Sequence, residues 1–292
     1  MDYVDLHTHS TASDGSFRPQ ELVTMARDRG LRAMALTDHD TIDGVAEAIQ
    51  AGAQLGIEVI PGIEISADFP EGTMHILGYF IDYQQPLFNQ QLQVLKEARA
   101  HRNPRIVEKL NQLGLTISWE DILQVSGGGQ IGRPHIARAL VVKGYVQDQQ
   151  EAFDQYLRQG GPAYVPKFRL PPAEAIALIR QAQGIPVLAH PFTLGLGLEQ
   201  LKAQLQELQE LGLAGLEVYY PEHSQNMQAD YFRLTQELGL LVTGGSDFHG
   251  ANKPGIELGK GPHQRYLTYE LVLNLKAWLQ TQPRGRLAAK RD

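Results

Sequence analysis

The stretch YVDLHTH at residues 3–9 decides the fold, because it ends a short apolar run with two histidines. Side chains alternate along an extended strand, so His7 and His9 would lie on the same side of it. Similar runs return as MALTDHD at residues 34–40, PVLAH at 186–190 and LLVTGGSDFH at 240–249. Parallel strands in a barrel gather such ends at one face, where the active sites of these barrels lie. The pattern therefore predicts a barrel whose mouth carries imidazoles and carboxylates.

Potential metal ligands occur in or just after these predicted strands. Glu64 follows the apolar run VIPGI at residues 59–63, and a carboxylate is rarely buried unless it is paired or metal-bound. Each signal alone is weak: His75 would more often be a core histidine, and Asp40 or Thr41 is a candidate helix cap. Together they predict a metal centre. The candidate ligands are His7, His9, Asp14, His39, Glu64, His75, His190, Asp247 and His249.

The ligand types restrict the metal. Imidazole and carboxylate without thiolate suit divalent zinc, manganese or iron. The set is too large for one tetrahedral ion, and it suffices for two or three ions if Glu64 bridges them. The chain has no cysteine, which excludes disulfides and thiolate ligation and fits a reducing cytoplasm.

Strand-like and helix-like segments alternate at both ends of the chain. This order predicts an α/β fold with parallel strands and right-handed crossovers. The strand-like runs lie near residues 3–9, 32–37, 57–66, 73–81, 185–189, 214–219 and 240–244. The helical patterns lie near residues 18–29, 44–55, 172–183, 198–211, 224–238 and 269–280.

Residues 101–167 interrupt this alternation with a mostly helical pattern. We interpret them as an inserted cap over the barrel mouth, since insertions there commonly acquire function. The alternative is a helical ornament on the outside of the barrel. The expected organisation is thus a first barrel part at 1–100, the insertion at 101–167, a second barrel part at 168–282 and a basic tail at 283–292.

Charge is distributed unevenly along the chain. The formal net charge is -7 over 292 residues, which gives no overall sign of a nonspecific nucleic-acid binder. The insertion carries eight Lys and Arg against six Asp and Glu, so it is the basic part of an acidic protein. No apolar run approaches the length needed to cross a bilayer, and no secretory signal is recognisable. We therefore expect a cytoplasmic protein without membrane association and without an obligate protein partner.

These motifs resemble the polymerase and histidinol phosphatase (PHP) family over nearly the whole chain. The motifs that carry the resemblance are HTHS at residues 7–10, TDHD at 37–40, GIE at 62–64, HP at 190–191 and SDFH at 246–249. The resemblance implies a distorted (β/α)7 barrel with three divalent ions. It assigns His7, His9, Glu64 and Asp247 to the first ion, Glu64, His75 and His190 to the second, and Asp14, His39 and His249 to the third.

The insertion carries further motifs of the same kind. RNPR at residues 102–105, GRPHIAR at 132–138 and PAYVPK at 162–167 resemble the family branch of 3′,5′-nucleotide bisphosphate phosphatases and related 5′→3′ oligonucleotide exonucleases. Arginine is suited to bidentate capture of phosphate. The resemblance thus implies a phosphate-binding set in the insertion: Arg102, Asn103, Arg105, Arg133, His135 and Lys167.

Two other features have competing interpretations. GGGQIG at residues 127–132 fits G-x-G-x-x-G, but it follows a helical pattern, so the dinucleotide interpretation fails its context. The loop could instead cradle a phosphate at the start of the next helix, or be a plain interhelical loop. His223 follows a predicted strand end and is either a proton donor or substrate contact, or a simple helix-start residue.

The sequence favours a metal-dependent phosphomonoesterase that removes the 3′-phosphate of nucleoside 3′,5′-bisphosphates. Manganese is the expected metal, with zinc or iron possible, and the expected catalytic residues are Asp14, Glu64, Asp247 and His223. The expected partner is a small nucleotide, with short oligonucleotides as a second option. The main alternative is a 5′→3′ exonuclease. Less favoured are a histidinol phosphatase, a non-catalytic PHP module and an amidohydrolase acting on a carbon substrate.

Overall fold

The computed structural model describes residues 2–70, 72–126 and 131–282. Most of the glycine-rich loop, at residues 127–130, and the basic tail at 283–292 lie outside the described residues. The predictions made for those two segments therefore stay predictions.

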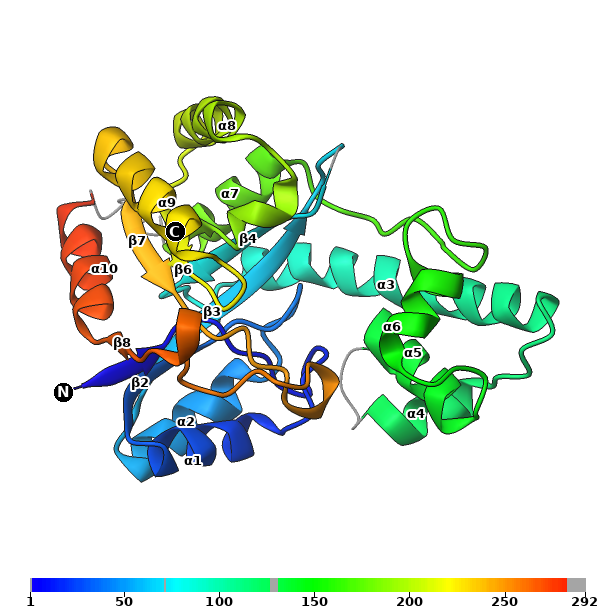
Figure 1. Ribbon diagram of the computed structural model, residues 1–292. Helices are drawn as coiled ribbons and strands as arrows, with labels where there is room; N and C mark the ends of the chain where they lie inside the picture. The colour runs from blue at the N-terminus through cyan, green and yellow to red at the C-terminus, as the bar shows by residue number, and fades with distance from the viewer. Residues whose placement is uncertain (1, 71, 127–130, 283–292) are drawn as a thin grey trace, which may run out of the picture.

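A single eight-stranded sheet in the order β7-β6-β5-β4-β3-β2-β1-β8 curls into a nearly closed barrel (Figure 1). The barrel prediction is thus confirmed, and β8 adds a short strand that was not predicted. The strands are β1 Tyr3–Asp5, β2 Leu31–Leu36, β3 Glu58–Ala67, β4 Met74–Tyr79, β5 Ile185–Leu188, β6 Gly215–Tyr219, β7 Leu241–Gly244 and β8 Leu267–Thr268.

Helices cover the outside of this sheet (Figure 1). Side chains of β2 show how the two faces divide: Met34 and Leu36 pack outward in the cluster shared with the helices, while Ala33 and Ala35 pack into the barrel interior. The alternation follows from the period of two along a strand. The covering helices are α1 Pro19–Asp28, α2 Val45–Leu55, α7 Pro172–Gln181, α8 Leu198–Glu210 and α9 Gln225–Leu238. Helix α10 Glu270–Thr281 instead packs its buried side chains against the interior cluster.

The predicted parallel arrangement is wrong for β4, and the additional strand β8 is antiparallel as well. Strand β4 pairs antiparallel with both β3 and β5, and β8 pairs antiparallel with β1. The connection between β3 and β4 spans only residues 68–73, whereas a parallel crossover needs a dozen residues or more. The reversal has a consequence for function: it brings His75, near the start of β4, beside Ser66, near the end of β3. His75 therefore reaches the barrel end where the parallel strands finish.

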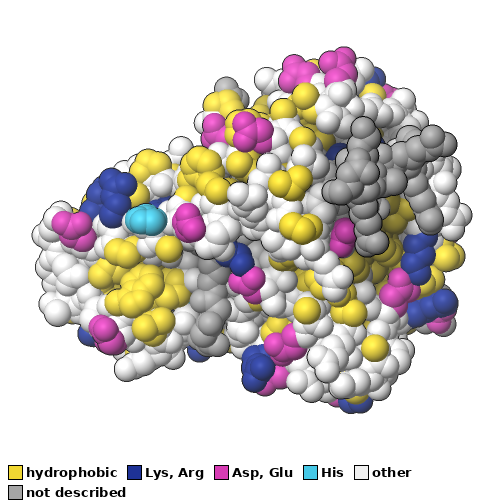
Figure 2. Space-filling model, turned by 180° about the vertical axis from the view of Figure 1, so that it is seen from behind, with side chains coloured by type: hydrophobic (Ala, Val, Ile, Leu, Met, Phe, Trp, Pro, Cys, Tyr) yellow, Lys and Arg dark blue, Asp and Glu magenta, His cyan; other side chains and the backbone are white. Residues whose placement is uncertain are grey.

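The insertion is a helical unit with its own hydrophobic core. Helix α3, Pro86–Gln112, runs through residue 101 and through Pro104 without a break, so the insertion begins inside a continuous helix. Helices α4 Trp119–Ser126, α5 Arg133–Val142 and α6 Gln149–Ala152 gather around its far end, and seen from behind they form a smaller lobe beside the barrel (Figures 1 and 2). A separate cluster that includes Ile106, Leu140 and Val165 fills this lobe. Within the described ranges, no helix is long and apolar enough to cross a membrane.

Candidate metal centre

The segment after β1 is held extended between two neighbouring strand ends. The backbone N–H of Asp247 donates to His7 O at 2.8 Å, and that of His9 donates to Phe248 O at 3.0 Å. Thr37 N donates to Thr8 O at 2.9 Å on the other side. Gly245 permits this close approach, because a Cβ there would lie 2.4 Å from His7 N. His7 and His9 therefore lie on the same side of the strand, as the sequence predicts.

Glu64 lies at the centre of the cluster and is fully buried. Its Oε1 is 2.8 Å from His75 Nδ1 and 2.9 Å from His190 Nε2. The other oxygen, Oε2, is 3.2 Å from the Nε2 atoms of both His7 and His9 and 3.0 Å from His39 Nδ1. The two carboxylate oxygens thus face different imidazoles, so each oxygen would be able to ligate a different divalent ion.

The charge of Glu64 is fixed by its surroundings. Burial acts to raise its pKa, but the nearby His39, His7 and His75 more than offset that effect and hold the pKa well below its usual range. Glu64 is therefore an ionised carboxylate at neutral pH.

Asp247 completes one group of converging ligand atoms. Its Oδ1 lies 3.1 Å from His9 Nε2 and 3.4 Å from His7 Nε2. Together with Glu64, these residues place one ligand atom each within 4.8 Å of one another. This group has the same members as the set that the family resemblance assigns to the first ion.

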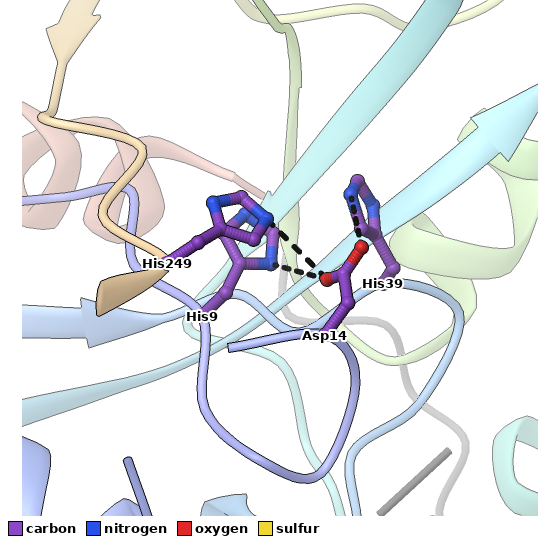
Figure 3. A group of neighbouring side chains, drawn as sticks. All are labelled: His9, Asp14, His39 and His249. Carbon is purple, nitrogen blue, oxygen red and sulfur yellow. Dashed lines mark ion pairs between the residues drawn. The ribbon is translucent and has the colours of Figure 1, made fainter. Parts of the chain in front are cut away.

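A second group surrounds Asp14 (Figure 3). Its Oδ1 lies 3.3 Å from His249 Nε2 and 4.0 Å from His9 Nδ1, and its Oδ2 lies 4.0 Å from His39 Nε2. The resemblance implies Asp14, His39 and His249 for the third ion; the structure adds His9 to them. His9 thus contributes one ring nitrogen to each of two groups.

A third group differs in one member from the expected second set. It contains His39, Glu64 and His75, while the expectation was Glu64, His75 and His190. His190 nevertheless contacts Glu64 Oε1 at 2.9 Å. All the candidate ligands predicted from the sequence therefore lie within one cluster at the barrel mouth.

The donor atoms of this cluster fit divalent cations. Among the described residues, both ring nitrogens of His9, Nδ1 of His39 and Oδ1 of Asp14 are buried without a hydrogen-bond partner. Buried polar atoms are rarely left unsatisfied in this way. Imidazole nitrogens that face carboxylate oxygens at about hydrogen-bond distance need a proton or a cation between them. With only nitrogen and oxygen donors, the cluster matches the preferences of zinc, manganese or iron.

The backbone at the mouth is unusual at three positions. Asp40, His190 and Asp247 have φ values of 55°, 24° and 54°, a region that residues with a side chain rarely adopt. Such conformations persist only where surrounding contacts fix them, and they are found mostly at functional sites. Asp40, for example, is fixed by hydrogen bonds from both Ser66 N and Ser66 Oγ.

Sequence reasoning missed Glu217. Its Oε1 lies 2.9 Å from His7 Nδ1, and its Oε2 accepts a hydrogen bond of 2.8 Å from His190 N. A carboxylate on Nδ1 fixes the imidazole tautomer and orients Nε2 toward the metal. The signal was present, because Glu217 is a carboxylate inside the apolar run GLEVY at residues 215–219. It is fully buried.

Two further buried carboxylates hold the loops at the mouth. Asp38 accepts hydrogen bonds from Ser10 N, Ser10 Oγ and Ser13 Oγ at 2.6–2.8 Å. Asp5 accepts from Ser246 N at 2.9 Å and from Gly259 N at 2.7 Å. These bonds fix the loops that carry Asp14 and Asp247.

We expect Glu217→Gln to weaken metal binding by about tenfold to a hundredfold, the usual effect of losing the outer partner of a ligand histidine. Titration of metal-stripped protein with manganese measures this change. Glu210→Gln, at an exposed position of α8, is the matched control and should leave the affinity unchanged. An unchanged affinity for Glu217→Gln would show that His7 is oriented by other contacts.

The structure places the candidate phosphate-binding residues of the insertion at several different locations. Arg102 and Arg133 both lie near Tyr164, with guanidinium carbons 5.9 and 5.8 Å from its ring centre. Arg102 Nε donates to Val165 O at 2.8 Å, and Arg133 Nη1 donates to Leu157 O at 2.9 Å. Backbone carbonyls thus orient both guanidinium groups.

The remaining candidates lie in three places. Asn103 Nδ2 donates to Ile131 O at 2.7 Å, and Gly132 N donates to His135 Nδ1 at 3.0 Å, so both residues lie near the start of α5. Arg105 is exposed. Lys167 instead reaches the barrel, where its Nζ lies 2.8 Å from Asp40 Oδ2.

His223 is buried beside the cluster. Its Nδ1 donates to Val218 O at 2.8 Å, and its ring centre lies 5.2 Å from that of Tyr220. With the proton on Nδ1, Nε2 carries a lone pair, and no hydrogen-bond partner for it occurs among the described residues. Burial lowers the pKa of His223, which favours this neutral form. In this form Nε2 can accept a proton or a hydrogen bond but cannot donate one.

Comparison with known proteins places this geometry in a family. A family model described as the PHP domain matches residues 5–163. A 3′,5′-nucleoside bisphosphate phosphatase of Chromobacterium violaceum is 33% identical over 260 residues, covering 89% of this chain and 91% of its own. A 5′-3′ exoribonuclease of Haemophilus influenzae is 36% identical over 256 residues, covering 88% and 93%.

A solved structure agrees with these relatives. A protein of Bifidobacterium adolescentis, named as a candidate metal-dependent phosphoesterase, superposes with a TM-score of 0.85 at 31% identity, covering 94% of this chain and 96% of its own. Sequence motifs, barrel and ligand cluster thus lead to the same conclusion: the chain belongs to the PHP-domain family.

Proposed function

We propose that this protein is a metal-dependent phosphomonoesterase that converts nucleoside 3′,5′-bisphosphates to the 5′-monophosphate and phosphate. The observation that carries the proposal is the pairing of two sites for anions. One is the ligand cluster bridged by Glu64, and the other is the cationic group Arg102 and Arg133 around Tyr164. The name of the Chromobacterium relative supports the same substrate class.

A short segment of chain links the two sites. Arg102 holds the carbonyl of Val165, and Lys167, two residues further on, contacts Asp40 beside the cluster. Two residues of extended chain span about 7 Å. The segment 165–167 therefore connects the cationic group to the edge of the metal centre.

Each part of the site has a role in this reaction. Divalent ions held by the cluster would lower the pKa of a water and stabilise charge on the attacking and leaving oxygens. Glu64, Asp14 and Asp247 supply the negative charge that retains the ions. The 5′-phosphate is bound by Arg102 and Arg133, with Asn103, Arg105 and His135. Lys167 contacts the substrate at the edge of the cluster. His223 Nε2 accepts a hydrogen bond from the substrate or from water.

The runner-up is a 5′→3′ exonuclease on short oligonucleotides. The relative named as an exoribonuclease supports it, and the same cluster would cleave a diester if the insertion leaves room for a chain. In a histidinol phosphatase or an amidohydrolase, the cationic group of Arg102 and Arg133 would have no role. A non-catalytic module leaves the complete ligand cluster without one.

The discriminating experiment compares kcat/KM for adenosine 3′,5′-bisphosphate and for a short 5′-phosphorylated oligoribonucleotide, both with manganese. We expect the bisphosphate to be the better substrate. Adenosine 5′-monophosphate, which lacks the 3′-phosphate, is the control and should release no phosphate. A higher kcat/KM for the oligonucleotide would replace the phosphatase by the exonuclease.

The setting of the reaction follows from the same properties. We propose manganese as the working metal and the cytoplasm as the compartment, because the ligands are nitrogen and oxygen and the chain lacks cysteine. A small nucleotide is the proposed partner, with neither a membrane nor an obligate protein partner.

A further inference from the structure

The three carboxylates of the ligand cluster differ in how their two oxygens are used. Both oxygens of Glu64 face imidazole nitrogens, and so do both oxygens of Asp14. Asp247 is different. Its Oδ1 faces His9 and His7, but its Oδ2 is directed away from them toward a phenol and an ammonium group. One oxygen of Asp247 is therefore available to a metal, and the other is occupied by the protein.

The partners of Oδ2 form a closed triangle. Tyr220 Oη donates to Asp247 Oδ2 at 2.9 Å, and Lys253 Nζ donates to the same oxygen at 2.9 Å. Lys253 Nζ also donates to Tyr220 Oη at 2.8 Å. The third direction of the ammonium group faces Glu222 Oε1 at 3.5 Å. All three donors of Lys253 thus point at oxygen atoms, which leaves the side chain little freedom.

Burial sets this triangle apart from a surface ion pair. Tyr220 is 3% exposed and Asp247 is 7% exposed, while the side chain of Lys253 is 30% exposed. A charge-assisted hydrogen bond in such surroundings is stronger than one in solvent. Lys253 itself lies in the loop after His249, where the neighbouring Asn252 Nδ2 donates to Asp14 O at 2.9 Å. The same short loop thus contacts two residues of the ligand cluster.

We propose that Lys253, acting with Tyr220, is a positioning residue that restricts Asp247 to binding metal through Oδ1 alone. The proposal rests on the metal centre of the proposed function. With Oδ2 held by two donors, the carboxylate cannot turn to offer both oxygens to one ion. Without them, Asp247 is free to rotate about its side chain, and an uncompensated carboxylate oxygen is left buried beside the cluster. Lys253 thereby fixes the orientation of the Asp247 carboxylate and places a positive charge next to Oδ2.

The test uses the full-length chain with Lys253→Met as the main variant. Methionine keeps an unbranched side chain of similar length but removes the ammonium group. Lys253→Arg restores a cationic donor to Oδ2, and Tyr220→Phe removes the other donor alone. Lys260→Met is the matched control, because Lys260 lies 3.7 Å over the ring of Tyr266 and not at the cluster.

Manganese binding is measured first, by electron paramagnetic resonance during titration of metal-stripped protein. We expect Lys253→Met to weaken one class of sites by about tenfold to a hundredfold and to change the signal of the bound ion. Tyr220→Phe should act in the same direction, Lys253→Arg should recover part of the affinity, and Lys260→Met should match the wild type. In turnover of adenosine 3′,5′-bisphosphate, Lys253→Met should lower kcat more than it raises KM.

The outcomes separate this inference from the proposed function. Wild-type affinity and an unaltered signal in Lys253→Met overturn the positioning role, whatever the substrate proves to be. So does a lower melting temperature of the metal-stripped variant with unchanged manganese affinity, because that pattern marks a purely structural ion pair. If the wild type turns over only oligonucleotides, the substrate assignment fails while the binding result still supports the role of Lys253. A wild type that binds no divalent ion overturns both.

Discussion

Glu64→Gln should reduce turnover by several orders of magnitude while the protein stays folded. The two oxygens of Glu64 face separate imidazole groups at 2.8–3.0 Å, so a neutral amide would remove a negative charge from the centre of the cluster and replace one ligand oxygen by an NH2 group. Bound cations are the largest local charges in such a site, and their loss removes the electrostatic stabilisation of the reaction. Phosphate release with saturating manganese measures the effect, and elemental analysis of the same sample reports the ions retained.

Asp68→Asn serves as the control for Glu64→Gln. Asp68 directly follows β3, the strand that carries Glu64, and lies outside the ligand cluster, so this variant should keep full activity. Circular dichroism of both variants checks that the barrel is intact. A Glu64→Gln protein that keeps wild-type activity and wild-type metal content would contradict the bridging role. The other ligands would then have to form the centre without it.

Arg102→Gln should impair the bisphosphate selectively. The guanidinium of Arg102 is nearly buried in the insertion beside Tyr164, and glutamine keeps much of the packing while it removes the charge. A hydrogen bond to a charged group contributes about 1.5–3 kcal/mol, which corresponds to about tenfold to a hundredfold in kcat/KM. Adenosine 3′-monophosphate lacks the 5′-phosphate, so its kcat/KM should change little. The ratio of the two values is the measured quantity.

Arg105→Ala is the companion variant on the same helix. Because Arg105 is exposed, solvent screens its charge, and we expect a smaller loss in the same direction. Equal losses on both substrates for Arg102→Gln would contradict the assignment. They would show that Arg102 supports the insertion through Val165 and does not bind the 5′-phosphate.

The sequence was sufficient for features that depend on local pattern. His7 and His9 stand two residues apart on a strand, and Glu64 interrupts an apolar run, so their types and spacing predicted a cluster before any contact was known. A barrel was predictable for the same reason, because alternating strands and helices leave few other folds.

Other features depended on side-chain contacts that no sequence motif indicates. Glu217 contacts His7 from a strand 210 residues further along the chain, and Lys253 contacts Asp247 from the loop that follows His249. The wrong prediction of a parallel β4 has a different cause. The connection at residues 68–73 is too short for a parallel crossover, and its length could be seen in the sequence. Helix α3 runs through residue 101 and Pro104, so no element ends at the expected start of the insertion, and its bounds stay a prediction.

The identity of the cleaved phosphate distinguishes the two possible orientations of the substrate. Adenosine 3′,5′-bisphosphate is incubated with the manganese-loaded protein, and the products are resolved by phosphorus NMR. We expect adenosine 5′-monophosphate and inorganic phosphate as the products, because in the proposed function the metal centre takes the 3′-phosphate while Arg102 and Arg133 hold the 5′-phosphate. Adenosine 3′-monophosphate as the nucleotide product would contradict this assignment and reverse the roles of the two sites.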